Sequence, residues 1–260
     1  MKKLILFILL SLCIALQASA WNPMIMTSGT SAAVCDTTNI VFWWRVEALD
    51  FSADNGTTDY SIGDDVGTFA SDAAINTDAR YGTTGNGLDI PSDYDNVYFE
   101  ATNLTALDDE GRAGFWVYFN NLTSPDGAVL FRVYDASTDV FRLRIEAPDE
   151  LEAFWRDASI SRTMVVTTDA NIVINTWYWI EVAWKTSTNY REIFVNGSAP
   201  TQTGAGTTIN SFGTAVVNFG WGDTDGAAPT EIDFYIDNVM ISTDSTHDLN
   251  LCKDETEWPE

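Results

Sequence analysis

Short runs in which apolar and polar residues alternate recur along this chain of 260 residues, whereas helical periodicity is scarce. Alternation with a period of two is typical of β-strands, because successive side chains point to opposite faces of a sheet. Turn dipeptides that tolerate positive φ separate several of the runs, as at Asn55-Gly56, Asp126-Gly127, Asn196-Gly197 and Asp225-Gly226. The pattern predicts an all-β fold, an antiparallel two-sheet jelly-roll sandwich. The predicted strands are 40–46, 114–119, 129–134, 140–146, 177–184, 192–195, 216–219 and 231–241.

The first 20 residues have the organisation of a secretory leader. Two lysines precede an apolar run at 4–16, and Ala18-Ser19-Ala20 supplies the small residues of a cleavage site. The apolar run is too short to span a bilayer comfortably. We therefore expect a signal peptide at 1–20 and a secreted, extracellular protein, with the cell surface or periplasm as alternatives. The remaining chain divides into an N-terminal extension at 21–34, one domain at 35–252 and an acidic tail at 253–260.

The charge balance restricts the partners of this chain. It has 38 acidic and 13 basic residues, a formal net charge of −25, and loss of the leader would remove two of the basic residues. A surface this negative repels phosphate backbones and anionic lipid headgroups. We expect neither a nucleic-acid partner nor membrane insertion, although solubility alone also explains such a charge.

Two cysteines lie near the ends of the predicted domain. Cys35 and Cys252 remain after the predicted cleavage, and in an oxidising compartment an isolated pair most simply forms a disulfide. Closing so long a loop stabilises by about 4 to 5 kcal/mol in the chain-entropy model. Free or intermolecular thiols are the alternative.

Three segments that follow one another along the chain carry a family resemblance. They are Gly114-Phe115-Trp116-Val117-Tyr118-Phe119, the Trp-rich run at 175–184 with Ile193-Phe194-Val195-Asn196-Gly197 after it, and Tyr235-Ile236-Asp237-Asn238-Val239-Met240-Ile241. Together they resemble the laminin-G-like domains of the concanavalin A-like lectin/glucanase superfamily. The resemblance implies two curved antiparallel sheets, one convex and one concave, and a glycan on the concave sheet.

Charge predicts which face of the Trp-rich strand is exposed. Glu181 shares a face with Trp177 and Trp179, so burying that face would bury a carboxylate. Two outward indoles beside a carboxylate suit sugar binding, because pyranose C–H faces stack on aromatic rings while hydroxyl groups need fixed partners. The alternative is that a loop covers these tryptophans. Trp116 and Tyr118 also alternate with apolar residues, but no charged residue fixes their register.

Arginines are concentrated on two predicted strands. Arg142 and Arg144 alternate with apolar residues, and Arg132 lies between Phe131 and Val133, so all three should face outward. On one face with the tryptophans they would form a positive aromatic strip that suits an acidic or sulfated glycan. Pairing with nearby acidic residues is the alternative. The candidate ligand-binding residues are Trp177, Trp179, Glu181, Arg142, Arg144, Arg132, Trp116 and Tyr118.

The sequence offers no complete catalytic set. The segment Glu231-Ile232-Asp233-Phe234-Tyr235-Ile236 begins like the Glu-x-Asp-x-x-Glu motif of retaining glucanases in the superfamily, but Ile236 stands at the acid/base position. The sole histidine, His247, follows the last predicted strand, and no Ser-His-Asp, Cys-His or His-rich set can be assembled. We expect no catalytic residues and no enzyme activity, with a divergent polysaccharide hydrolase or lyase as the minor alternative.

The resemblance also raises the question of calcium. Many superfamily members carry a structural Ca²⁺ between the first and last strands, and oxygen ligands suit this ion. Asp237 matches the ligating residue of the closing strand, and Glu47 is the candidate from the opening strand. Structural calcium at these two residues is as well supported as its absence.

The leading hypothesis is a secreted, non-catalytic, lectin-like domain that recognises an extracellular polysaccharide or other glycan. The alternative is a structural or adhesive surface protein that self-associates into a layer, filament or particle.

Overall fold

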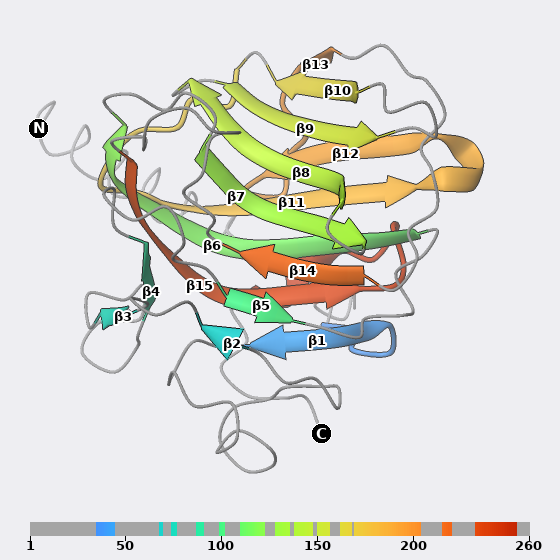
Figure 1. Cartoon of the computed structure of the whole chain (residues 1–260), viewed down its shortest axis with the longest axis horizontal. Coiled ribbons are helices and arrows are strands. Elements are labelled where there is room, and N and C mark those ends of the chain that lie inside the picture. The colour runs from blue at the N-terminus through green and yellow to red at the C-terminus, as the bar shows by residue number, and fades with distance from the viewer. Residues whose placement is uncertain are drawn as a thin grey trace, which may run out of the picture. The chain divides into compact units, whose positions relative to one another are not determined.

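In the residues that it describes, the computed structural model of the chain contains two antiparallel sheets and two short 3₁₀ turns (Figure 1). All of these residues belong to the unit Cys35–Glu260. The predicted signal peptide, the N-terminal extension, Glu47 and the tail beyond Lys253 lie outside the described part. The described residues are 35–44, 68–69, 74–76, 87–90, 99–101, 110–122, 128–135, 138–147, 150–156, 162–167, 169–203, 215–219 and 232–253.

The seven-stranded sheet is built around two long strands, β6 and β15, which pair with each other. On its other side, β15 pairs with β4 through its first half and with β1 through its second half. In sheet order the strands are β12 (Tyr190–Val195), β11 (Trp177–Lys185), β6 (Glu110–Leu122), β15 (Ile232–Ser242), β4 (Gly87–Ile90) and β3 (Ala74–Asn76), with β1 (Ile40–Trp44) beside β15.

The eight-stranded sheet contains a run of strands that are consecutive along the chain, from β7 to β10. Its strands in order are β13 (Gln202–Thr203), β10 (Arg162–Thr167), β9 (Glu150–Arg156), β8 (Thr138–Ala147), β7 (Ala128–Asp135), β14 (Ala215–Phe219), β5 (Phe99–Ala101) and β2 (Thr68–Phe69). The 3₁₀ turns are η3 (Thr186–Thr188) and η4 (Leu249–Leu251). The described part of the chain thus contains no helix with the length and hydropathy of a membrane span.

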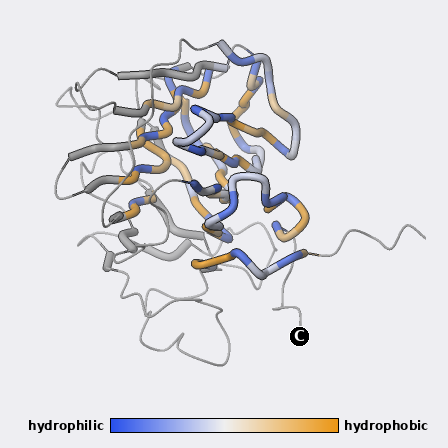
Figure 2. Tube along the Cα trace, turned by 90° about the vertical axis from the view of Figure 1, so that its right-hand side faces the viewer, coloured by the Kyte–Doolittle hydropathy of each residue, from blue (hydrophilic) through white to orange (hydrophobic). Residues whose placement is uncertain are grey.

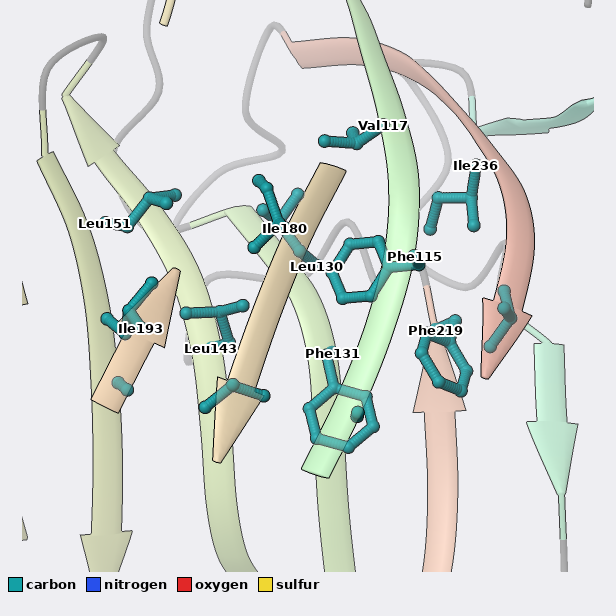
Figure 3. Packing of buried hydrophobic residues seen from close by; sticks show 14 of the residues in the cluster. Phe115, Val117, Leu130, Phe131, Leu143, Leu151, Ile180, Ile193, Phe219 and Ile236 are labelled. Carbon is teal, nitrogen blue, oxygen red and sulfur yellow. The ribbon is translucent and has the colours of Figure 1, made fainter. Parts of the chain in front are cut away.

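The two sheets pack face to face over a single large apolar core. Figure 3 shows Phe115 from β6 and Phe131 from β7 among the side chains that point into the space between the sheets. Phe115 meets Phe219 of β14 edge to face, with ring centroids 5.5 Å apart and an interplanar angle of 79°. This geometry favours aromatic pairs because the positive ring edge meets the negative ring face.

The alternating pattern of the sequence explains the layers. Hydrophobic and hydrophilic residues alternate along the described strands (Figure 2), so each sheet has one face that must be removed from water. On β11, Tyr178, Ile180, Val182 and Trp184 all lie in the core between the sheets, as the position of Glu181 predicted. The predicted fold class, an all-β antiparallel sandwich, is confirmed.

The outer edge of β12 is closed by a side chain rather than by another strand. The amide of Gln202 on β13 accepts the N–H of Ile193 at 2.9 Å and donates to its carbonyl at 3.0 Å. Two residues on, the N–H and carbonyl of Val195 pair with Ser198 at 2.8 and 3.1 Å. An open edge strand is a template for strand addition by another chain. These contacts occupy backbone groups that such an addition would need.

Gly114 makes room for an indole. A Cβ atom built on Gly114 would lie 2.6 Å from Cζ2 of Trp179, which is far inside normal van der Waals contact. Glycine is otherwise unfavourable within a strand, so its presence on β6 is explained by this close approach.

We therefore expect Gly114→Ala to destabilise the protein by about 1 to 3 kcal/mol, as overpacking of a filled site does. Urea unfolding followed by circular dichroism measures the change. The control is Ser187→Ala in the η3 turn, where the side chain is exposed, and it should change the unfolding free energy by less than about 0.5 kcal/mol. If Gly114→Ala stabilised the protein, as β-propensity alone predicts, the close approach of Trp179 would be disproved.

Candidate functional site

The outer face of the seven-stranded sheet carries two neighbouring rows of large side chains. Trp177 on β11 lies opposite Tyr118 on β6, and Tyr118 lies opposite Tyr235 on β15. Two residues along the strands, Trp179 lies opposite Trp116. One row is covered by another part of the chain and the other is half-exposed. The half-exposed row is the candidate site.

The row that contains Trp116 and Trp179 is covered by the end of the described chain. Residues 247–253, here called the covering segment, contribute Leu249 and Cys252 to a second apolar cluster on this face. Trp43 and Met240 complete the floor of that cluster, and the disulfide between Cys35 and Cys252 ties the segment to the residues that precede β1. The predicted disulfide is confirmed.

Backbone hydrogen bonds hold the covering segment on the sheet. The carbonyl of Lys253 accepts hydrogen bonds from Nε1 of Trp116 at 2.9 Å and from Nδ2 of Asn238 at 2.7 Å. Oδ1 of Asn238 in turn accepts the indole N–H of Trp43. Two of the indole N–H groups of this buried cluster are thereby satisfied without water, as buried polar groups require.

The Val-Asn-Gly turn of the family resemblance packs against the same segment. Asn196 and Gly197 have φ angles of 52° and 77°, and a Cβ on Gly197 would lie 2.8 Å from Nδ2 of Asn250. The side chain of Asn196 accepts the backbone N–H of Trp179 at 3.0 Å. The turn thus joins the Trp-rich strand to the covering segment.

The structure corrects the expected exposure of Trp179, Glu181 and Trp116. The predicted face is right, since Trp177, Trp179 and Glu181 lie on the face away from the main core. Trp179 and Glu181 are nevertheless 0% exposed, and Trp116 is 6% exposed. The alternative considered from the sequence, in which a loop covers the tryptophans, is the arrangement found, because the disulfide and Leu249 bring the covering segment over them.

Glu181 is engaged in a buried ion pair instead of facing solvent. Its Oε2 lies 2.6 Å from Nε of Arg112, and the Arg112 guanidinium stacks over the ring of Phe194 at 4.2 Å. Burial raises the pKa of Glu181 above its ordinary value, and the attraction of Arg112 offsets this only in part. The carboxylate is thus a structural partner of Arg112 and not a free ligand group.

The second row remains half-exposed and is the candidate site. Trp177, Tyr118 and Tyr235, here called the aromatic row, come from three adjacent strands. The Tyr118 ring lies 5.3 Å from that of Trp177 and 5.8 Å from that of Tyr235, and the two tyrosine rings are almost parallel, with an interplanar angle of 9°. Mutual packing holds the three rings in place while part of each stays in contact with water.

A fixed loop places an amide beside the aromatic row. Oδ1 of Asn175 accepts the hydroxyl hydrogen of Tyr118 at 3.2 Å, and the Asn175 N–H donates to the carbonyl of Phe119 at 2.8 Å. The hydroxyl of Tyr178 accepts the N–H of Val173 at 3.0 Å, which anchors the same loop to the core strand. Sequence reasoning missed Asn175 and Tyr235, although alternation with the buried Phe234 and Ile236 could have placed Tyr235 on the outer face.

The arginines belong to the other sheet. Arg132 is on β7, whereas Arg142 and Arg144 are on β8, so they face away from the sandwich on the side opposite the aromatic row. A strip that combines them with the tryptophans is therefore excluded. Arg142 is only 7% exposed, and Arg132 lies directly opposite it.

Arg144 is engaged in ion pairs with acidic residues of its own sheet. Its guanidinium pairs with Glu152 at 2.5 Å and with Glu146 at 2.9 Å, and it lies over the ring of Phe154 at 4.4 Å. For this arginine, the alternative of pairing with nearby acidic residues is the arrangement found.

Of the two residues considered for calcium, the structure describes only Asp237. Oδ1 of Asp237 accepts the backbone N–H of Asn238 at 2.7 Å, and the Asp237 side chain is buried against the sheet. Within the described ranges no group of three or more His, Cys, Asp or Glu residues could hold a metal ion. Calcium at Glu47 and Asp237 stays a prediction, since Glu47 lies outside those ranges.

The residues considered for catalysis make contacts that stabilise the fold. Ile236, at the acid/base position of the glucanase motif, is fully buried in the main core. His247 does meet a serine, with Nδ1 2.9 Å from Oγ of Ser242, a contact that the sequence did not indicate. Ser242 is 0% exposed and accepts the N–H of Asp244, so this pair fixes the start of the covering segment.

Comparisons with known proteins agree with the fold. A family model of the laminin-G type, described as the concanavalin A-like lectin/glucanases superfamily, matches residues 91–248. This confirms the resemblance inferred from the three sequence segments. No curated protein sequence matches the chain significantly.

Several solved structures have a similar fold at low identity. The receptor binding domain of the botulinum neurotoxin C/D mosaic serotype matches with a TM-score of 0.62 and 12% identity, over 84% of this chain and 51% of that one. The type G receptor binding domain gives 0.56 and 15%, over 82% and 50%. The serotype D ligand binding domain, solved in complex with N-acetylneuraminic acid, gives 0.58 and 13%, over 82% and 49%. The chain spans about half the length of these domains, and the likeness concerns the fold alone.

The first prediction from this site concerns the disulfide. Because Cys35 and Cys252 are 217 residues apart, replacing both by serine should lower the free energy of unfolding by about 3 to 5 kcal/mol in the chain-entropy model. Urea unfolding of the wild type with and without reductant, beside the double variant, measures this. Reductant should destabilise only the wild type, and a loss below about 1 kcal/mol would contradict the anchoring role.

The second prediction concerns pH. The raised pKa of Glu181 means that its contribution to stability is fully present below the ordinary value of 4.5 and is lost as the pH rises through the raised value. Glu181→Gln cannot titrate, so the wild type should lose stability relative to this variant between pH 4.5 and neutral pH. Urea unfolding of both proteins across this range measures how the difference between their free energies of unfolding changes with pH. If the wild type instead gained stability relative to Glu181→Gln as the pH rose, the pKa of Glu181 would be lowered and the interpretation would be wrong.

Proposed function

Because the chain belongs to the concanavalin A-like lectin/glucanases superfamily, we propose that it is a secreted, non-catalytic protein that binds an extracellular glycan on the aromatic row. The observation that carries the proposal is the set of three half-exposed rings on adjacent strands, with the amide of Asn175 fixed beside them. Aromatic surface and a few placed polar groups are what sugar rings and their hydroxyls require.

The difference between the two rows supports this choice of site. A row buried under the covering segment offers no surface to a ligand, whereas Trp177, Tyr118 and Tyr235 keep part of their surface in water. Their mutual packing and the hydrogen bond from Tyr118 to Asn175 restrict the side chains before any ligand arrives. Groups that are already ordered lose less conformational entropy on binding.

The non-catalytic part of the proposal is supported by the place of Ile236. A retaining glycosidase needs two carboxyl groups about 5 Å apart across the scissile bond. Ile236 occupies the second of these positions and packs in the main core. Export is supported by the leader-like residues 1–20 and by the disulfide, which forms in oxidising compartments.

Affinity electrophoresis in gels that contain a single polysaccharide tests the proposal. Dextran, laminarin, xylan, galactomannan, alginate and dextran sulfate serve as probes. We expect at least one of them to retard the wild type, and Trp177→Ala or Tyr235→Ala to weaken that binding about tenfold, or about 1.4 kcal/mol.

Two controls make the result specific to the aromatic row. Thr188→Ala, on the exposed η3 turn of the same sheet, should bind like the wild type, and circular dichroism confirms that each variant is folded. Arg144→Ala tests the opposite sheet and should also bind like the wild type. Retardation by no probe, or equal retardation of the wild type and the Trp177→Ala variant, would reject the proposal.

Self-assembly into a layer, filament or particle is the second function considered from the sequence. Strand addition at β12 is disfavoured because Gln202 and Ser198 occupy the backbone groups of Ile193 and Val195 at its outer edge. We therefore prefer glycan binding.

A further inference from the structure

Resting on the proposed glycan-binding function, we infer that the ligand of the aromatic row is an uncharged polysaccharide, bound through ring faces and hydroxyl groups. The inference follows from where the described basic side chains of this face are held. It deepens the proposal by assigning the chemical class of the ligand.

The basic side chains of the seven-stranded sheet are engaged elsewhere. Arg112 is buried against Glu181 and Phe194, and the ammonium group of Lys185 pairs with Glu110. Arg191 on β12 donates to Oδ1 of Asn189 at 3.4 Å, at the hairpin end away from Trp177. None of these cations is directed at the aromatic row.

Lys253 lies over the covered row, where the covering segment holds it. Its ammonium group donates to Oδ1 of Asn250 at 2.6 Å and lies 5.7 Å from the centroid of the Trp116 ring. A cation over an indole face is attracted to the ring quadrupole, so this position is favourable without any ligand. The side chain therefore stays with the covered row, two residues along β6 from Tyr118.

The polar side chains that the structure describes beside Tyr118 are neutral. The Tyr118 hydroxyl and the Asn175 amide offer donors and acceptors without charge, which match pyranose hydroxyls. A sugar carboxylate or sulfate placed here would lose part of its hydration without gaining a cationic partner among the described side chains, which is unfavourable. Of the described arginines, Arg132, Arg142 and Arg144 lie on the opposite side of the sandwich.

The net charge of the protein also disfavours anionic ligands, and it acts at longer range. A chain with a formal charge of −25 repels a polyanion during approach, and physiological salt screens this over about 8 Å. A neutral polysaccharide experiences no such repulsion. The inferred ligand class therefore differs from the acidic sugar in the serotype D complex, with which this chain shares only the fold.

The test compares polysaccharides that share a backbone and differ in charge. Laminarin and dextran are each paired with their carboxymethylated and sulfated derivatives, and binding of the full chain is measured at low and at physiological salt. We expect at least one neutral parent to bind with an affinity that salt hardly changes, and its charged derivatives to bind at least about tenfold more weakly at low salt. Lys253→Gln should leave binding of the neutral parent unchanged, and Trp177→Ala should weaken it.

The outcomes separate this inference from the proposal on which it rests. If the charged derivatives bound more tightly than their parent, and Trp177→Ala weakened that binding, the aromatic row would be a glycan site and the inference of a neutral ligand would be overturned. A loss of affinity in Lys253→Gln would likewise overturn it, because it would show a cation in contact with the glycan. Binding to no parent and to no derivative would overturn the proposed function together with this inference.

Discussion

The disulfide between Cys35 and Cys252 is the constraint on which the outer face of the seven-stranded sheet depends. It holds residues 247–253 over Trp116 and Trp179, and the carbonyl of Lys253 satisfies the indole N–H of Trp116 there. Aromatic side chains that an uncovered sheet would present to water therefore form a second small core. What remains available is the adjacent aromatic row, so one covalent bond helps to define both the covered and the exposed part of this face.

The sandwich also separates two groups of residues that the sequence places only about 30 positions apart. Arg142 is on β8 of one sheet, and Trp177 is on β11 of the other, so their outward side chains face opposite directions. The guanidinium of Arg144 is paired within its own sheet with Glu152 and Glu146. A chain this acidic thus uses a basic residue to neutralise neighbouring carboxylates on the sheet opposite the aromatic row.

Sequence reasoning predicted what depends on local alternation. It identified eight of the fifteen described strands and the buried face of β11 that contains Tyr178 and Ile180, but it missed β9 and β10 among others. From the cysteine count it also predicted the disulfide. It failed where contacts join distant parts of the chain. Alternation predicts which side chains share a face of a strand. The burial of Trp179, however, depends on a segment about 70 residues later in the chain. The separation of Arg142 from Trp177 depends on how the strands are divided between the two sheets.

A glycan bound to this protein should contact the aromatic row and not the covered row. Nuclear magnetic resonance of the ¹⁵N-labelled indole groups, assigned by substitution and followed while a bound oligosaccharide is added, tests it most directly. We expect the Trp177 signal to shift and saturate while the Trp179 signal stays in place. A saturating shift of Trp179 without one of Trp177 would contradict it.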